Sequence, residues 1–334
     1  MRIALDAMGA DSAPDAEVEG AIRAAPGLKG HEVVLVGDEA RIAQAAARLG
    51  GIPSGIVVRH ASQVVTMDDP PVEAMRRKPD SSIARCIEMM ATGEADAVVS
   101  AGNTGAVVAF ATFKLGLLEG VRRPGIAVAM PTRRAERTLV IDCGANVNCT
   151  PEHLLQYGIM ASAYARHVFG ASHPRVGLLN IGEESIKGNR LVKHAQKLLE
   201  TSALNFIGNV EGRDVFSGEA DVVVCEGFVG NVLLKVSEGM AETILSMMKE
   251  AIQRTLRRRI GALLCKYAML ELKAKVDYAE FGGAPLLGVN GTVTICHGGS
   301  DHRAIAAAVR IAAEAAAHKV NQHIVAGLRT RRAS

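Results

Sequence analysis

The sequence is poor in aromatic residues and has no tryptophan. Aromatic side chains make up 3% of the 334 residues, and the formal net charge is only +3. Single-stranded nucleic acids bind on platforms of aromatic rings, and nucleic-acid-binding domains in general carry strongly basic surfaces. The composition therefore argues against a nucleic-acid partner.

Cysteine pairs with metal-binding spacing are also missing. The six cysteines are scattered without a Cys-x-x-Cys pair, so a zinc site is not indicated and a reduced setting is the simpler interpretation. No apolar run reaches the roughly twenty residues that cross a bilayer, and the apolar stretch after Met1-Arg2 is too short for a signal peptide. We therefore expect a cytoplasmic protein with no membrane span, no metal and no cofactor.

Several common catalytic motifs are absent from the sequence. It contains no Gly-x-x-x-x-Gly-Lys-[Ser/Thr], no Gly-x-Gly-x-x-Gly after the first expected strand, no His-Glu-x-x-His and no Gly-x-Ser-x-Gly. These absences argue against a Walker-type ATP site, a standard dinucleotide site, a zinc peptidase and a serine hydrolase elbow. No protein nucleophile is evident, although Ser100, Ser300 and the cysteines stay open. A site without its own nucleophile most simply positions two substrates for direct reaction.

Small and apolar residues are abundant instead, with 34 glycines and 49% hydrophobic residues. Such a composition suits close packing of helices on a sheet. Segments typical of strands alternate with helical segments, which predicts a doubly wound, largely parallel sheet. The expected strands are 2–6, 32–36, 55–60, 97–99, 125–130, 138–141, 175–180, 203–208, 220–225 and 292–296. The clearest expected helices are 16–25, 39–49, 72–77, 81–92, 151–167 and 303–325.

The stretch 95–104 is the one around which the site is predicted. A buried strand ends at Ser100, a turn of small residues includes Gly102 and Asn103, and a helix begins near Thr104. Free backbone N–H groups and the positive end of a helix dipole at such a turn favour an anion. The alternative is an ordinary turn in which Asn103 or Thr104 only caps the helix.

Other expected strands also end in polar residues. Ligands in open α/β sheets bind outside the carboxyl ends of strands, so we expect these ends to contribute to one site. Asp6 and Asp11 flank the first turn, where they hold a hydrogen-bond network or a metal, or cap a helix. The further candidates are Asp142 and Asn146, Lys187 between two glycines, Asn231, and His297. A lone lysine such as Lys187 is more often a solvated surface residue.

A long helical stretch, 232–275, follows the strand 220–225, with an expected break near Gly261. Apolar residues on one face of its second half are combined with basic residues mostly off that face. This pattern suits the surface of an anionic membrane, and it equally suits a helix that buries its stripe in a dimer interface. The candidate contact residues are Leu256, Arg257, Arg258, Ile260, Leu263 and Leu264.

Seven segments together carry a family resemblance. They are 6–11, 100–106, 142–147, 180–184, 208–214, 227–231 and 281–291, and they follow one another in the family's order. On these segments the chain resembles the bacterial phosphate acyltransferases of phospholipid synthesis, the PlsX family, from Met1 to about Val325. Two small-residue departures are visible, at Ala10 and Gly299, where the family commonly has glycine and serine.

The resemblance implies a fold, a reaction and partners. The fold is three-layer α/β/α with a largely parallel sheet, related to phosphotransacetylase and to isocitrate and isopropylmalate dehydrogenases, with a protruding helical hairpin. The reaction converts acyl-[acyl-carrier protein] and inorganic phosphate to acyl phosphate and free carrier protein. Family members are cytoplasmic homodimers associated with the membrane, and they pass acyl phosphate to a membrane glycerol-3-phosphate acyltransferase. We expect one domain over 1–328, a helical protrusion at about 240–275, and a basic tail at 329–334.

The predicted residues fit that reaction. Phosphate is expected at the helix start, held by Asn103, Thr104 and Lys187, with Asp6, Ser100, Gly102 and Asp142 around it. Asn146, Asn231 or backbone N–H groups are the candidate donors to the developing oxyanion, and His297 is the candidate acid for the leaving thiolate.

Three other functions remain open from the sequence. The first is a phosphotransacetylase that acts on a short acyl-CoA. The second is a metal- and NAD-dependent decarboxylating dehydrogenase, for which Asp6, Asp11 and Asp142 could supply metal ligands. The third is a non-catalytic membrane scaffold of lipid synthesis.

Overall fold

The computed structural model describes residues 1–28, 30–134, 137–276 and 282–332. Its strands form one eleven-stranded sheet in the order β3-β2-β1-β4-β11-β10-β5-β6-β9-β7-β8. Seven of the ten strand pairings among the described residues are parallel, and the other three are antiparallel. The prediction of a largely parallel sheet is therefore confirmed.

The sheet has two halves that run in opposite directions. One half holds β1 (Arg2–Asp6), β2 (Glu32–Gly37), β3 (Ile56–His60), β4 (Ala97–Ser100) and β11 (Val293–Ile295). The other holds β6 (Arg137–Ile141), β7 (Arg175–Leu179), β8 (Asn205–Val210) and β9 (Val222–Val224). Between them, β10 (Ala284–Leu287) and β5 (Gly125–Pro131) pair antiparallel with each other and with the strand on their outer side.

The carboxyl ends of the two halves consequently point in opposite directions. We expected them to meet at one edge of the sheet, and that expectation is wrong. The register nevertheless brings them to the same height. Ser100 pairs with Ile295, which pairs with Ala284. Beyond β10, Ala127 pairs with Ile141 at the end of β6, within one residue of that height. Turns from both halves thus meet at the middle of the sheet, over β10 and β5.

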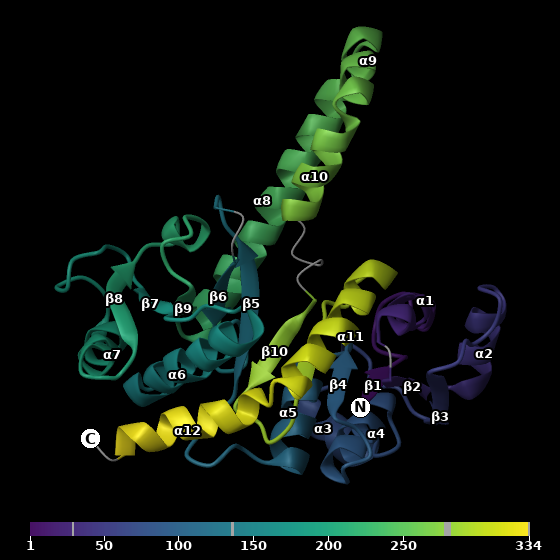
Figure 1. Ribbon diagram of the computed structural model, residues 1–334, viewed down its shortest axis with the longest axis horizontal. Coiled ribbons are helices and arrows are strands. Elements are labelled where there is room, and N and C mark those ends of the chain that lie inside the picture. Colours follow the sequence, from purple (N-terminus) through teal and green to yellow (C-terminus); the bar gives the residue numbers. More distant parts are fainter. Residues whose placement is uncertain (29, 135–136, 277–281, 333–334) are drawn as a thin grey trace.

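Helices cover both faces of the sheet (Figure 1). Alternate strand residues pack on the two sides, as the two-residue period of a strand requires; Ala4 belongs to one core and Ile3 and Leu5 to another. One face carries α3 (Pro71–Arg77), α4 (Ser82–Ala91), α5 (Thr104–Leu115) and the start of α8 (Gly227–Gln253). The opposite face carries α1 (Asp15–Ala24), α2 (Glu39–Ala47), α6 (Pro151–Val168), α7 (Arg190–Glu200), α11 (His302–Ala317) and α12 (Val320–Arg332). The result is the three-layer α/β/α architecture.

A helical hairpin projects from this body (Figure 1). It consists of the distal part of α8, α9 (Leu256–Leu264) and α10 (Lys266–Val276). The breaks lie at Arg254-Thr255 and at Cys265, whereas Gly261, where we expected the break, lies inside α9. Thr255 is extended and its side chain accepts from the Arg258 N–H, so a threonine N-cap starts the new helix. Within the described residues, no helix is long and apolar enough to span a bilayer.

Two other elements differ from the sequence-based expectation. The strand β10 was not expected as a strand. The single helix expected over 303–325 is two helices, because Lys319 adopts a positive φ of 49° between α11 and α12. The second of these helices continues to Arg332, through part of the segment expected to form a tail.

Candidate functional site

Hydrogen bonds join the turn after β1 to the turn after β4. The Ser100 hydroxyl donates to the Asp6 carboxylate at 2.7 Å, and the Gly102 N–H donates to the Ser100 Oγ at 3.1 Å. Both polar side chains are fully buried, and burial raises the pKa of Asp6. A Cβ at Gly9 would lie 2.5 Å from the Gly102 nitrogen, so only glycine permits this approach. These residues hold the turn in shape.

Asn103 fixes the start of α5. Its Oδ1 accepts from the Ala106 N–H, and its Nδ2 donates to the carbonyls of Thr66, Met67 and Asp69. Its donors are therefore already used within the protein. Thr104, the first helical residue, is exposed, and the first amides of a helix have no intrahelical partner. The anion-binding capacity of this turn lies in Thr104 and the adjacent amides.

Asp142 organises the turn after β6 in the same way. Its carboxylate accepts from the backbone N–H groups of Ile126, Gly144, Ala145 and Asn146. Burial raises the pKa of Asp142, while these bonds act to lower it. Asn146 donates from Nδ2 to the Pro124 carbonyl, to the Tyr157 hydroxyl and to Asp142.

Close packing of α8 on this turn places Asn231. A Cβ at Gly230 would overlap the carbonyl oxygen of Asp142, so glycine lets the helix touch the turn. The Glu226 carboxylate accepts from the N–H groups of Phe228 and Val229, which satisfies the helix N-terminus internally. A Cβ on Gly144 would be 3.6 Å from the Asn231 side chain.

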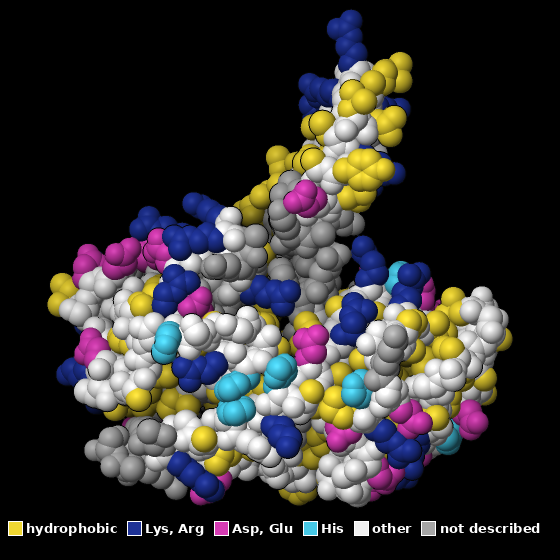
Figure 2. Space-filling view, in the orientation of Figure 1, with side chains coloured by type: hydrophobic (Ala, Val, Ile, Leu, Met, Phe, Trp, Pro, Cys, Tyr) yellow, Lys and Arg dark blue, Asp and Glu magenta, His cyan; other side chains and the backbone are white. Residues whose placement is uncertain are grey.

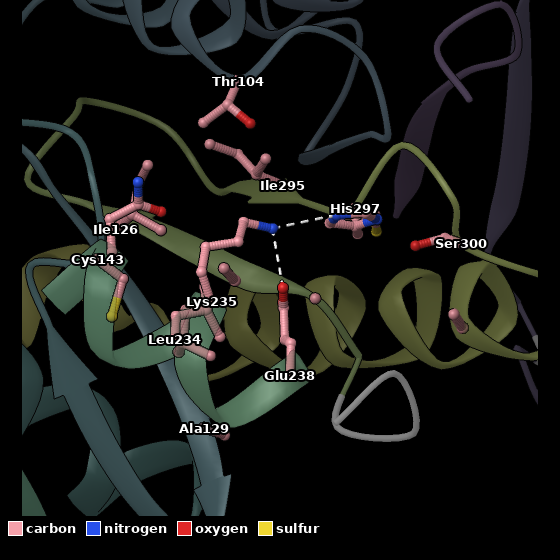
Figure 3. Close-up of a pocket in the computed structure, with 16 residues that line it drawn as sticks. Thr104, Ile126, Ala129, Cys143, Leu234, Lys235, Glu238, Ile295, His297 and Ser300 are labelled. Atoms are coloured by element: carbon pink, nitrogen blue, oxygen red, sulfur yellow. Dashed lines mark hydrogen bonds and ion pairs between the residues drawn. The ribbon is translucent and has the colours of Figure 1, made fainter. Parts of the chain in front are cut away.

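A cavity of about 150 Å³ lies between the start of α5 and α8, above β5, β10 and β11 (Figure 3). Its wall is mainly apolar, and polar groups enter from three directions. Polar and ionisable residues that line it are Thr104, Asn231, Lys235, Glu238, His297 and Ser300; apolar ones include Ile126, Val128, Cys143, Leu234, Ala284 and Ile295. An apolar hollow with a few polar groups is the usual form of a ligand site, although this one is small.

Lys235 and His297 form a pair of donors in this cavity. The Lys235 Nζ lies 2.8 Å from the Glu238 Oε2 and 3.3 Å from the His297 Nε2 (Figure 3). The Gly299 N–H donates to the His297 Nδ1 at 3.1 Å, so a neutral ring carries its hydrogen on Nε2. The two neighbouring donors cannot satisfy each other, and an oxyanion would accept from both.

The cavity's thiols are poor nucleophiles. Burial raises the pKa of Cys296 to about 12, and it raises the pKa of Cys143 further. Because the thiolate is the reactive form, both remain inert near neutral pH. Ser100 is fully buried and donates to Asp6. These observations argue against the cavity's thiols and Ser100 as the nucleophile, which leaves Ser300 in the lining or a substrate to supply it.

The structure brings some of the predicted site residues together and separates others. Thr104, Asn231 and His297 line one cavity, and Asp6, Ser100, Gly102, Asn103, Asp142 and Asn146 shape the turns around it. Lys187 is exposed in the loop between β7 and α7 and is not among the described lining residues. The sequence reading missed Lys235 and Glu238. Their spacing from Asn231, at i+4 and i+7, would have placed all three on one helix face.

No group of three or more histidine, cysteine, aspartate or glutamate side chains that could hold a metal occurs in the described part of the chain.

Solved structures share this fold. A phosphotransacetylase from Streptococcus pyogenes matches with a TM-score of 0.63 and 17% identity, over 95% of this chain and 94% of that one. The EutD phosphotransacetylase from Staphylococcus aureus matches with a TM-score of 0.60 and 18% identity, over the same shares. The architecture is therefore that of the phosphotransacetylase-like α/β proteins.

Sequence relatives define the family. A model described as "Fatty acid synthesis protein" matches residues 1–323. The phosphate acyltransferase of Geotalea uraniireducens is 51% identical over 97% of this chain and 93% of its own length. That of Syntrophotalea carbinolica is 49% identical over 98% and 93%. The chain belongs to this bacterial phosphate acyltransferase family and is an acyltransferase, so the resemblance drawn from the seven segments is confirmed.

Proposed function

We propose that this enzyme transfers the acyl group of acyl-[acyl-carrier protein] to inorganic phosphate, giving acyl phosphate for phospholipid synthesis. The observation that carries the proposal is the cavity between α5 and α8. There a helix N-terminus and the Lys235–His297 pair adjoin an apolar wall. Such a cavity suits an inorganic anion next to an acyl thioester.

In the proposed mechanism, phosphate binds against Thr104, the first amides of α5, and the Lys235–His297 pair. A phosphate oxygen attacks the thioester carbonyl, forming the new C–O bond as the C–S bond breaks. The proton of hydrogen phosphate ends on the departing sulfur, so no proton is gained or lost overall. His297, which lines the cavity, is the candidate to assist this transfer.

The oxyanion that develops on the thioester carbonyl needs a donor. Asn231 and Asn146 were both candidates. The Asn146 amide already donates to three oxygens and lies outside the lining of this cavity, whereas Asn231 lines it. We therefore assign oxyanion stabilisation to Asn231.

The direct test uses purified enzyme and carrier protein loaded with a long acyl chain. Free thiol and acyl phosphate should appear together, and only when orthophosphate is present. Acetyl-CoA, offered as the alternative donor, should react far more slowly. Thiol release without phosphate would exclude the proposed reaction, and a preference for acetyl-CoA would indicate a phosphotransacetylase. Absence of any turnover would leave a scaffold role.

Lys187 provides a separate prediction. If this lysine binds phosphate, as the sequence suggested, Lys187→Ala should raise the KM for phosphate sharply and leave the KM for the thioester little changed. Its loop would have to reach the cavity during turnover, because the side chain is exposed outside it. Steady-state kinetics at varied phosphate decide the matter. An unchanged phosphate KM would remove Lys187 from the phosphate site.

The hairpin supports a peripheral association with anionic membranes as part of the same proposal. No residue of α9 is buried, and Leu256, Leu263 and Leu264 are 70–81% exposed. Figure 2 shows apolar side chains along the hairpin with Lys and Arg toward its tip. Arg258 donates to a carbonyl of α8, so part of the basic set also joins the two helices, while Arg257 and Ile260 are exposed.

This position would let the enzyme pass acyl phosphate to a membrane glycerol-3-phosphate acyltransferase. The proposed homodimer would cover a different stripe, on α8. Its exposed members are Val232, Val236, Met240, Ile244 and Met247.

Charge introduced into α9 should weaken membrane binding. Leu263→Glu should lower co-sedimentation with anionic vesicles by about tenfold, because the exposed leucine no longer enters the interface and the new carboxylate is repelled. Gln253→Glu adds the same charge without removing an apolar side chain and serves as the control. Vesicle binding that is unchanged by Leu263→Glu, with a weakened dimer instead, would assign α9 to the interface between subunits.

A further inference from the structure

A second cavity, of about 530 Å³, runs along α5. Six of its lining residues are Thr104, Gly105, Val108, Ala109, Thr112 and Phe113. Their spacing follows one face of a helix from Thr104 to Phe113, which is about 13 Å of helix axis. Segments 122–124 and 144–146, with Met75 and Leu117, complete the lining. The volume is in the range of sites for organic ligands, unlike that of the smaller cavity.

The two cavities are adjacent, because three segments of the chain contribute lining residues to both. Thr104 lines both. Pro124 lines the second cavity and Ile126 the first, while Gly144 lines the second and Cys143 the first. A ligand lying in the groove along α5 therefore has one end next to the proposed phosphate position.

This second cavity, the α5 groove, combines apolar surface with positive charge. Phe113 is 73% exposed, in a chain with few aromatic residues, and Val108 is half-buried. Arg122 and Arg123 are exposed, and neither forms an ion pair within the described residues. Burial lowers the pKa of His153 nearby, the positive charges of Arg123 and Arg122 add to this effect, and Glu152 opposes it, so both arginines lie close to this ring.

We propose that this groove binds the 4′-phosphopantetheine arm of the acyl donor. The inference rests on the proposed function and names where its thioester substrate lies. The phosphodiester end of the arm pairs with Arg122 and Arg123, its methylene and dimethyl groups lie on Val108 and Phe113, and its sulfur reaches Thr104. The arm is common to carrier proteins and coenzyme A, so its binding does not depend on the carrier's own surface.

The test compares the KM of two donors in full-length enzyme. In the double variant Arg122→Gln/Arg123→Gln, the KM for acyl-carrier protein and for acyl-CoA should each rise about tenfold, with kcat nearly unchanged. Phe113→Ser should raise both as well. The variant Arg122→Lys/Arg123→Lys should recover most of the affinity. The control Arg190→Gln/Lys193→Gln removes the same charge from α7 and should leave both KM values unchanged.

Binding without turnover gives a second readout. Holo-carrier protein should bind wild-type enzyme more tightly than apo-carrier protein, which lacks the arm, and this difference should vanish in the arginine double variant. A rise in KM for the carrier alone, with acyl-CoA unaffected, would overturn the proposal in favour of contact with the carrier's body. Unchanged KM values in a variant that still makes acyl phosphate would overturn it while leaving the proposed reaction intact.

Discussion

Replacing Lys235 with methionine should reduce kcat/KM for phosphate by about 10²- to 10³-fold, the usual cost of removing one preorganised donor to a reacting oxyanion. The change keeps much of the side chain's apolar length and removes its charge. Lys235 lines the cavity with its Nζ 2.8 Å from Glu238 and 3.3 Å from His297. The described lining holds no second lysine or arginine that could replace a lost ammonium group. Acyl phosphate formation at varied phosphate measures the effect.

Two further variants make this result specific. Lys249→Met removes the same charge from an exposed position on the distal part of α8 and should leave the reaction unchanged. Glu238→Gln keeps the ammonium but loosens its position, and should cost no more than about tenfold, since the partner of a half-exposed lysine contributes modestly. A Lys235→Met enzyme with normal phosphate dependence would remove this lysine from the phosphate site and leave Lys187 as the remaining candidate.

Replacing Glu17 with glutamine should stabilise the protein at pH 8 by about 3 kcal/mol and change little near pH 4.5. Glu17 is fully buried in α1, where one oxygen accepts from the Ala10 N–H and the other, Oε2, has no partner within the described residues. Burial raises the pKa of Glu17 from 4.5 to about 7. Each unit of difference corresponds to about 1.36 kcal/mol.

The direction of this effect follows from proton binding. Between pH 4.5 and 7 the folded chain holds a proton on Glu17 that the unfolded chain has released, so the free energy of unfolding falls as the pH rises through this window. Above pH 7 the buried carboxylate is charged and the full cost remains. Glutamine is uncharged at every pH and escapes this cost. Urea-unfolding midpoints at pH 5 and pH 8 measure the difference between the two chains.

An exposed acid is the matched control for Glu17. Glu39→Gln on α2 changes the same functional group at an exposed position and should shift the unfolding midpoint slightly and equally at both pH values. If Glu17→Gln also gave equal shifts at both pH values, the carboxyl would not titrate near neutrality in the folded state.

The strands were predictable because apolar β-branched runs end abruptly in small polar residues, as at Val98-Val99 before Ser100. β10 was not, because it is short, contains Pro285 and follows no helix–strand rhythm. The opposite direction of the two halves results from three successive antiparallel pairings, β11–β10, β10–β5 and β5–β6, and the first two of these involve β10. Local pattern carries no information on such long-range pairing.

The site was predictable close to the carboxyl end of a strand and was missed further along a helix. Thr104 and His297 come shortly after a strand, Asn231 lies in the first turns of α8, and all three reach the cavity. Lys235 lies eight residues into α8, where lysine is common on a solvated face, and only the approach of β11's turn makes it a cavity residue. From the sequence, Lys187 was a stronger candidate for the phosphate-binding lysine than Lys235, because it stands between glycines. In the structure its loop is exposed to solvent.

The strand order has a consequence for synthesis of the polypeptide. β10 and β11 come from residues 284–295, but they occupy the seam between strands made from the first 141 residues. A nascent chain that has emerged only to residue 276 therefore has strands of both halves of the sheet but lacks β10 and β11, which join them. Ala284, Ile295 and His297 are then still in the ribosome, so the cavity lacks the part of its lining that β10, β11 and the turn after β11 supply. Catalytic competence is therefore acquired only after residues 284–297 have left the ribosome.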